Sequence, residues 1–231
     1  MTDRGRTACE AVASETSSVV LKFSGGKDSV ACWLRLREYF ETIIPIFHYW
    51  IPDLAFVEKT ISMYEDYFST PIIRAPHPNF LNFLANGRFQ PPHRFNVVEA
   101  FDLATVDYDE VVQWVAEDEG YKDSWVAVGI KSSDSNIRRR IIEKQGAWTP
   151  KKKLFYPVAD MNKAQLIEMF RAHKVPLSDD YRIFGRSFDG LQYRYLKQIK
   201  EHYPQDYETI LSWFPLAEAE LMRYQAHEAQ G

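Results

Sequence analysis

The chain has 231 residues, of which 45% are hydrophobic and 26% are charged, and its formal net charge is −4 at pH 7. This composition excludes a disordered chain, and the negative net charge excludes a protein covered by nucleic acid over its whole surface. The two cysteines, Cys9 and Cys32, form no CxxC pair, so we expect neither an iron–sulfur cluster nor a zinc ion. There is no apolar signal core and no run approaching 18 apolar residues, which predicts a cytoplasmic protein without a membrane partner.

In chain order, residues 1–17 are polar and small, so we expect a flexible tail. Apolar runs then alternate with stretches of helical spacing. Strands are predicted over 19–23, 43–49, 71–75, 125–130 and 154–157. Helices are predicted over 28–40, 53–68, 80–84, 109–119, 136–144, 162–173, 191–202 and 207–226, with Asp53 as an N-cap and Pro204 and Pro215 as breaks. This order predicts an α/β protein with a parallel sheet and helices on both faces.

A phosphate-binding loop is predicted directly after the first strand, where the sequence reads SGGKDS over residues 24–29. It matches neither GxxxxGK[ST] nor GxGxxG, so it is not one of the two common phosphate loops. Glycines let the backbone turn its N–H groups toward an anion, and the following helix adds the positive end of its dipole. The residues expected to hold the phosphate are Ser24, Gly25, Gly26, Lys27, Asp28 and Ser29.

In this position, SGGKDS resembles the loop of the PP-loop ATP pyrophosphatases. The resemblance implies that the chain binds ATP, cleaves it between the α- and β-phosphates, and holds the pyrophosphate in the loop. It also implies that Lys27 and Asp28 are catalytic and that Asp28 acts through Mg²⁺.

A second stretch, VGIKSSDSNIRRR over residues 128–140, resembles the GxRxxES-xx-R pattern of the PAPS reductase branch. Gly129, Ser135 and Arg138 match this pattern directly, while Lys131 replaces its arginine and Asp134 its glutamate. The resemblance implies that Gly129, Lys131 and Ser135 bind nucleotide, that Arg138 is catalytic, and that Asp134 is a candidate substrate contact. Arg138 offers a bidentate fork for phosphate or sulfate.

Residues 156–181 also follow that branch, so the resemblance covers about residues 18–190. It implies a five-stranded parallel sheet in the order 3-2-1-4-5. We therefore predict three parts: a flexible tail over 1–17, a nucleotide-binding domain over 18–190 and a helical C-terminal extension over 191–231.

The chain departs from the reductases where they carry a cysteine nucleophile. Their RSxGC stretch reads Arg186-Ser187-Phe188-Asp189-Gly190 here, and glycine stands in place of the cysteine. Reduction requires a thiol, so we do not expect the chain to reduce PAPS by itself. Cys32 is expected to be a small buried hydrophobe.

Further candidate substrate residues are His48, His93, Arg94 and Arg186. His48 ends a predicted strand, and a packed, hydrogen-bonded histidine is the alternative. His93 and Arg94 lie in a proline-rich stretch within 76–107, where an exposed loop is the alternative.

The first hypothesis is an ATP-dependent adenylating enzyme that modifies a nucleic-acid base or backbone, with a protein as donor of sulfur or amine. The second is a sulfonucleotide enzyme that binds PAPS in place of ATP and uses a partner's thiols. The third is a non-catalytic nucleotide-binding subunit. Two basic triplets, 138–140 and 151–153, fit either a nucleic-acid backbone or a solvated face. An oligomer is compatible with each hypothesis.

Overall fold

The computed structural model describes residues 3–228, and these group into two compact units. The first, here called the sheet unit, consists of Met1–Phe47, Tyr67–Arg74 and Val112–Pro176. The second, the helical unit, consists of His48–Asp66, Ala75–Val111 and Leu177–Gly231. The predicted domain over 18–190 contributes to both units, whereas residues 191–228 of the predicted extension lie in the helical unit and its last three residues fall outside the described range.

The sheet has six strands in the order β3-β2-β1-β4-β6-β5. Their bounds are β1 Ser18–Phe23, β2 Thr42–Tyr49, β3 Ile73–Pro76, β4 Val126–Val128, β5 Trp148–Thr149 and β6 Leu154–Phe155. Strand β1 pairs in parallel with β2 and β4, and β4 pairs in parallel with β6. The five-stranded order 3-2-1-4-5 therefore needs one correction: its fifth strand is β6, and β5 is added at the edge in antiparallel pairing. A tight turn through Pro150–Lys152 forces this antiparallel return, and two residues are too few for a periodic signal.

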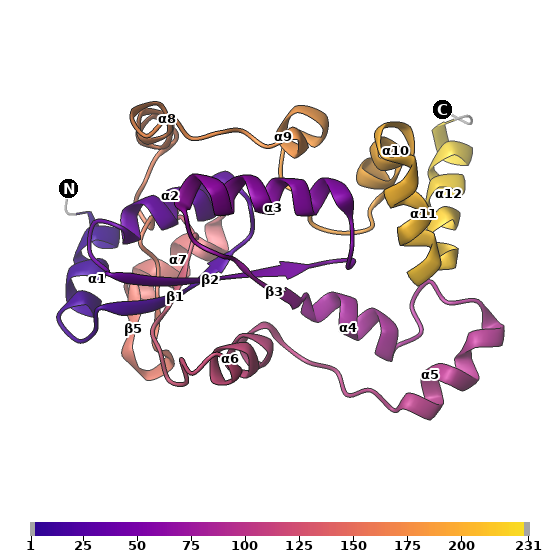
Figure 1. Ribbon diagram of the computed structural model, residues 1–231, viewed down its shortest axis with the longest axis horizontal. Coiled ribbons are helices and arrows are strands. Elements are labelled where there is room, and N and C mark those ends of the chain that lie inside the picture. Colours follow the sequence, from indigo (N-terminus) through magenta and orange to yellow (C-terminus); the bar gives the residue numbers. More distant parts are fainter. Residues whose placement is uncertain (1–2, 229–231) are drawn as a thin grey trace. The chain divides into compact units, whose positions relative to one another are not determined.

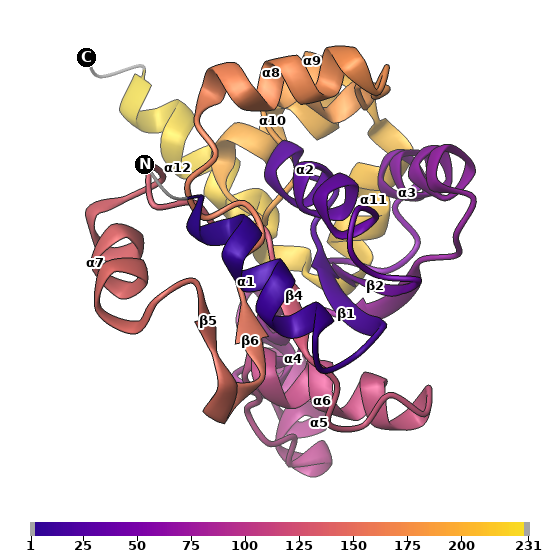
Figure 2. The same cartoon turned by 90° about the vertical axis from the view of Figure 1, so that its left-hand side faces the viewer.

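The core of the sheet unit is formed on both sides of β1. Val19, Val20 and Leu21 are fully buried, as expected of a central strand covered on both faces. The indole of Trp33, on helix α2 (Lys27–Leu36), stacks on the Phe68 ring with a centroid distance of 3.9 Å. Helices α2 and α8 (Lys163–Ala172) lie on one face of the sheet, and α6 (Tyr108–Asp118) lies on the other (Figures 1 and 2). Helix α7 (Asn136–Gln145) follows β4.

The segment predicted as a flexible tail contains helix α1 (Arg4–Ala13). Its Ala8, Cys9 and Val12 side chains are buried, and the Arg4 guanidinium lies 2.6 Å from the Asp160 carboxylate. Gly5 packs so closely that a Cβ there would lie 2.2 Å from the Pro157 carbonyl oxygen. The sequence concealed this helix because its buried stripe consists of small residues, which resemble a polar tail in composition.

The helical unit contains most of α3 (Ala55–Phe68). The other helices in this unit are α4 Pro78–Ala85, α5 Phe95–Phe101, α9 Asp179–Phe184, α10 Tyr193–His202, α11 Pro204–Trp213 and α12 Glu218–Glu228, with short 3-10 turns at Pro92–Arg94 and Pro215–Ala217. Asp53 was predicted to cap α3 but takes a left-handed conformation, with φ of 61°. The Asp206 carboxylate caps α3 in its place, accepting bonds from the Ala55 N–H at 2.8 Å and the Phe56 N–H at 3.1 Å. None of the helices within residues 3–228 has the length and apolar character needed to cross a bilayer.

Candidate functional site

The loop between β1 and α2 is shaped by its own serines. The Ser29 hydroxyl donates to the Gly26 carbonyl oxygen at 2.8 Å and accepts from the Ser24 N–H at 3.2 Å. The Ser24 hydroxyl donates to the Ser29 oxygen at 3.1 Å. Gly25 makes the turn with φ of 67°, a value that favours glycine. The two serines were expected to bind phosphate, but in this structure their hydroxyls hold the loop in shape.

Helix α2 begins at the end of this loop without a side-chain cap. Gly26 is its N-cap residue and has no side chain with which to accept a bond from the first turn. The N–H groups of that turn and the positive end of the helix dipole therefore remain available to an anion. Asp28, in the first turn, is the acidic residue that such a helix start favours.

Gly129, just after β4, brings a second segment against the loop. A Cβ at this position would lie 2.8 Å from the carbonyl carbon and oxygen of Asp28 and from the Ser29 nitrogen. Real Cβ atoms do not approach backbone so closely, so only glycine fits without a shift. The glycine therefore places the chain after β4 directly beside the start of α2.

Five of the predicted site residues form a continuous chain of ion pairs. Lys27 Nζ lies 3.3 Å from Asp28 Oδ2, and the other Asp28 oxygen pairs with Lys131. Lys131 Nζ lies 3.5 Å from Asp134 Oδ1, and Asp134 Oδ2 lies 3.0 Å from Arg138 Nη1. We call this set the ion-pair chain. Three cations and two carboxylates give it a net positive charge.

Exposure differs along the ion-pair chain. The Lys131 side chain, at its centre, is only 7% exposed, whereas those of Lys27 and Arg138, at its two ends, are each 48% exposed. A buried cation is tolerated because two carboxylates flank it. The exposed ends present one ammonium and one guanidinium to solvent, and these groups are suited to bind phosphate oxygens.

Asp28 was expected to act through Mg²⁺. It is the one loop carboxylate, and both of its oxygens contact ammonium groups. A single carboxylate fits Mg²⁺ only where phosphate oxygens and water supply the remaining ligands. Ser135, expected to bind nucleotide, caps α7 by accepting a bond from the Arg138 N–H at 3.1 Å. Its hydroxyl thereby fixes the start of the helix that carries Arg138.

The other predicted substrate residues belong to the helical unit. His48 is buried and makes an edge contact with the Tyr108 ring, which favours the packed alternative. His93 is exposed in the turn Pro92–Arg94. Arg94 donates to the Ser212 carbonyl oxygen at 3.3 Å, and Arg186 pairs with the Asp189 carboxylate at 2.6 Å. The structure thus brings together the loop and the segment after β4 within the sheet unit, whereas these four residues belong to the helical unit.

Neither cysteine is placed as a nucleophile. Cys32 is buried, as predicted, and Cys9 is also buried rather than lying in a tail. Burial raises the pKa of the Cys9 thiol to about 12 and raises that of Cys32 well above its usual value. At Gly190, where the reductases carry cysteine, φ is 143° and a Cβ would lie 3.3 Å from the Trp50 ring. A side chain at that position would be strained, so the conformation at Gly190 favours glycine over cysteine.

A buried histidine was missed by the sequence reasoning. His77 Nδ1 accepts a bond from the Asn79 N–H at 2.9 Å and so caps α4, while its Nε2 contacts the Tyr108 hydroxyl. The Trp50 ring stacks on the imidazole at 4.2 Å. Burial lowers the pKa of His77 to about 4, which keeps the ring neutral at pH 7. The available signal was its position before Pro78, a favoured first residue of a helix.

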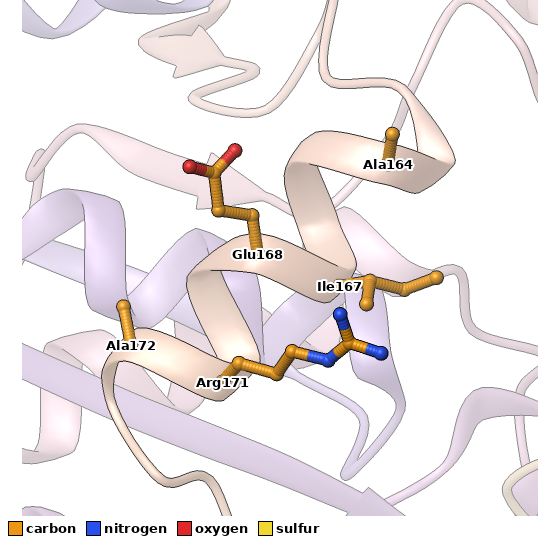
Figure 3. A pocket seen from close by; sticks show the side chains of 5 residues that line it. All are labelled: Ala164, Ile167, Glu168, Arg171 and Ala172. Carbon is orange, nitrogen blue, oxygen red and sulfur yellow. The ribbon is translucent and has the colours of Figure 1, made fainter.

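Figure 3 shows a pocket lined entirely by side chains of α8, namely Ala164, Ile167, Glu168, Arg171 and Ala172. No predicted site residue lines it, and one helix face offers no convergent set of polar groups. The ion-pair chain, rather than this hollow, is therefore the candidate site.

A parallel sheet whose first strand leads through a glycine loop into a helix is typical of α/β proteins that bind phosphate at the carboxyl ends of their strands. Among solved structures, the chain is similar to the U34-tRNA thiolase NcsA from Methanococcus maripaludis with its [4Fe-4S] cluster. The TM-score is 0.51 at 13% identity over 93% of this chain and 78% of NcsA. It is also similar to the NH3-dependent NAD synthetase from Campylobacter jejuni in complex with nitrate, with a TM-score of 0.47 at 11% identity over 95% and 93% of the two chains.

No family model and no curated protein matches the chain. The likeness to NcsA supports the predicted α/β fold, while the PP-loop superfamily and its PAPS reductase branch stay predictions. The expectation that excluded an iron–sulfur cluster was wrong for this fold, because NcsA has a similar fold and carries a [4Fe-4S] cluster. Within residues 3–228, no three His, Cys, Asp or Glu side chains are placed to hold a metal ion, so we derive no step through a cluster.

Proposed function

We propose that this chain binds ATP at the loop of residues 24–29 and transfers its AMP moiety to an acceptor. An acceptor oxygen attacks the α-phosphorus, and the new P–O bond forms as the bond to the α,β-bridging oxygen breaks. Pyrophosphate leaves with that electron pair. A second nucleophile, an amine, a sulfide or a partner's persulfide, then displaces AMP from the acceptor.

The observation that carries this proposal is the ion-pair chain. Its net positive charge lies beside an uncapped helix start, so both features favour a polyanion at the same place. Lys27 is exposed at the loop and is assigned to the leaving pyrophosphate. Arg138 is exposed at the other end and is assigned to the α-phosphate, where charge develops during attack.

Lys131 is assigned a positioning role. Its buried ammonium holds Asp28 and Asp134, and through them it orients the two exposed cations. Gly129 sets the approach of this segment to the loop. In this proposal the protein positions the reactants and stabilises the charge on the phosphates, and it supplies no nucleophile of its own.

Nucleotide binding tests this proposal without knowledge of the acceptor. We expect calorimetric titration to show ATP binding at least roughly tenfold more tightly than AMP, because only ATP places a pyrophosphate group in the loop. Lys27→Ala should remove most of this difference. The matched control is Lys163→Ala, which removes an exposed lysine at the start of α8 in the same unit.

Equal binding of AMP and ATP by the wild-type protein would overturn the loop assignment. PAPS is included as a third ligand, and tighter binding of PAPS than of ATP would favour the sulfonucleotide hypothesis over ours. Binding of ATP without formation of AMP, in the presence of nucleic acid and of candidate donor proteins, would favour the non-catalytic subunit.

A further inference from the structure

Positive charge is concentrated in one stretch of this acidic protein. Residues 131–153 carry eight Lys and Arg residues against two acidic ones, a net charge of +6, although the whole chain has −4. The remaining residues therefore carry −10. This separation of charge favours binding of a polyanionic partner at the basic stretch, because the remaining, acidic residues repel such a partner.

Most cations outside this stretch already have acidic partners. Examples are the pairs Arg4–Asp160, Lys59–Asp179, Arg186–Asp189 and Lys200–Glu218. Within residues 3–228, no ion pair involves Arg139, Arg140, Lys144, Lys151 or Lys152. All five side chains are exposed. We call these five residues, on α7 and the turn Pro150–Lys152, the basic strip.

The fold holds α7 with its basic side outward. Ile142 is 1% exposed and anchors the helix to the unit, while Ile137 is 72% exposed. Arg140 and Lys144 are four residues apart, so they share one face about 6 Å apart along the helix axis. Ile137 lies near them on the same face and adds apolar surface between the charges.

We propose that the basic strip binds the phosphate backbone of a nucleic acid. The strip is divided between two elements that are close in the chain, a helix and a turn, and simultaneous contact with both would require an extended polymer with a repeating charge. A membrane-binding helix would need a continuous apolar face. In helix α7, by contrast, Ile142 is buried in the core, and the exposed isoleucines are interspersed with cations.

The basic strip follows directly on the ion-pair chain. Arg138 ends that chain, and Arg139 is the first residue of the strip. A bound nucleic acid would therefore lie beside the candidate site. Binding by the strip does not depend on the proposed function; only the identification of the bound nucleic acid as the acceptor rests on it.

The test measures binding of the full chain to fluorescein-labelled duplex DNA, duplex RNA and single-stranded DNA by anisotropy at several salt concentrations. The strip variant combines Arg139→Gln, Arg140→Gln and Lys144→Gln. It should bind these nucleic acids at least roughly tenfold more weakly at low salt. For a duplex, the slope of log K against the logarithm of the salt concentration should be smaller in magnitude by about 2 to 3. A second variant, Lys151→Gln with Lys152→Gln, should show a smaller loss in the same direction.

The control variant combines Lys163→Gln, Arg171→Gln and Lys174→Gln, which removes three exposed cations of the same unit outside the strip. It should bind like the wild type, and the strip variants should keep their affinity for ATP. No binding to any of the three nucleic acids at low salt, or an equal loss in the control, would overturn the proposal. So would binding of equal strength, with the same dependence on the strip, to phosphatidylcholine vesicles containing phosphatidylserine. Nucleic-acid binding without any ATP binding would instead refute the proposed function and leave this inference standing.

Discussion

Gly129 and Asp28 lie in backbone contact, although about a hundred residues separate them in the sequence. A Cβ on Gly129 would lie 2.8 Å from the Asp28 carbonyl carbon and oxygen. This contact joins the end of β4 to the start of α2, and so it brings Lys131 within reach of the Asp28 carboxylate. The candidate site depends on this close approach.

Gly129→Ala should therefore disturb both the site and the stability of the fold. Relief of the clash requires the backbone after β4 to move, and overpacking of this kind costs about 1–3 kcal/mol. We expect the folded variant to bind ATP at least roughly tenfold more weakly, as the displaced Lys131 releases Asp28. Urea unfolding and ATP titration measure the two effects. Gly120→Ala is a control for ATP affinity: its left-handed φ of 80° will lower stability, but a Cβ there meets no atom within 4 Å, so ATP binding by the folded protein should stay at the wild-type level. Wild-type ATP affinity in Gly129→Ala would contradict the role assigned to this contact.

Lys131→Met should lower stability and also change the charge at the site. Removal of one member of a buried ion pair leaves its partners uncompensated and costs about 3 kcal/mol. Asp28 and Asp134 would then face the bound phosphates with an excess of negative charge, so ATP binding should weaken strongly. Lys131→Arg restores the charge and should recover part of both properties. If Lys131→Met bound ATP as well as the wild type does, the buried lysine would have no positioning role.

The sequence predicted best those features that are formed by residues close together in the chain. The SGGKDS loop and the pattern from Gly129 to Arg138 could be found because a strand, a turn and a helix follow one another directly. Contacts between distant segments could not be found this way: the Asp206 cap on α3 and the contact of Tyr108 with His77 join residues with no common pattern. Helix α1 was missed because its buried face is made of small residues. The inward hydrogen bonds of Ser24 and Ser29 depend on loop conformation, which residue types alone do not specify.

Asp180 should make the helical unit less stable as the pH rises. It is 4% exposed, and burial raises its pKa from 3.8 to about 6, although the Thr60 hydroxyl donates to it at 3.0 Å. The folded state thus holds the proton more tightly than the unfolded state, and this contribution to stability is lost as the pH rises from about 4 through 6. Asp180→Asn should therefore be about 2–3 kcal/mol more stable than the wild type at pH 7, relative to their difference at pH 4. Urea unfolding of both proteins at several pH values in this range measures the difference between their free energies of unfolding. A difference that does not change with pH would contradict the prediction.

His77, in contrast to Asp180, should make the protein less stable as the pH falls. Burial lowers its pKa from 6.5 to about 4, so the unfolded state binds the proton more tightly. The stability that the neutral ring contributes is present above pH 6.5 and is lost as the pH falls from there through 4. The wild type should lose about 3 kcal/mol relative to His77→Asn over this interval, since asparagine keeps the cap on α4 but does not titrate. Parallel pH profiles for the two proteins would show that His77 is not held neutral.

The position of ATP cleavage tests the central claim most directly. The full chain is incubated with ATP labelled in the α-phosphate, a nucleic acid that it binds and an amine or sulfide donor, and the products are separated. Our account predicts AMP, free or attached to an acceptor, together with an equal amount of pyrophosphate, and loss of both in Lys27→Ala. Formation of ADP and inorganic phosphate would contradict it, because attack would then fall on the γ-phosphate.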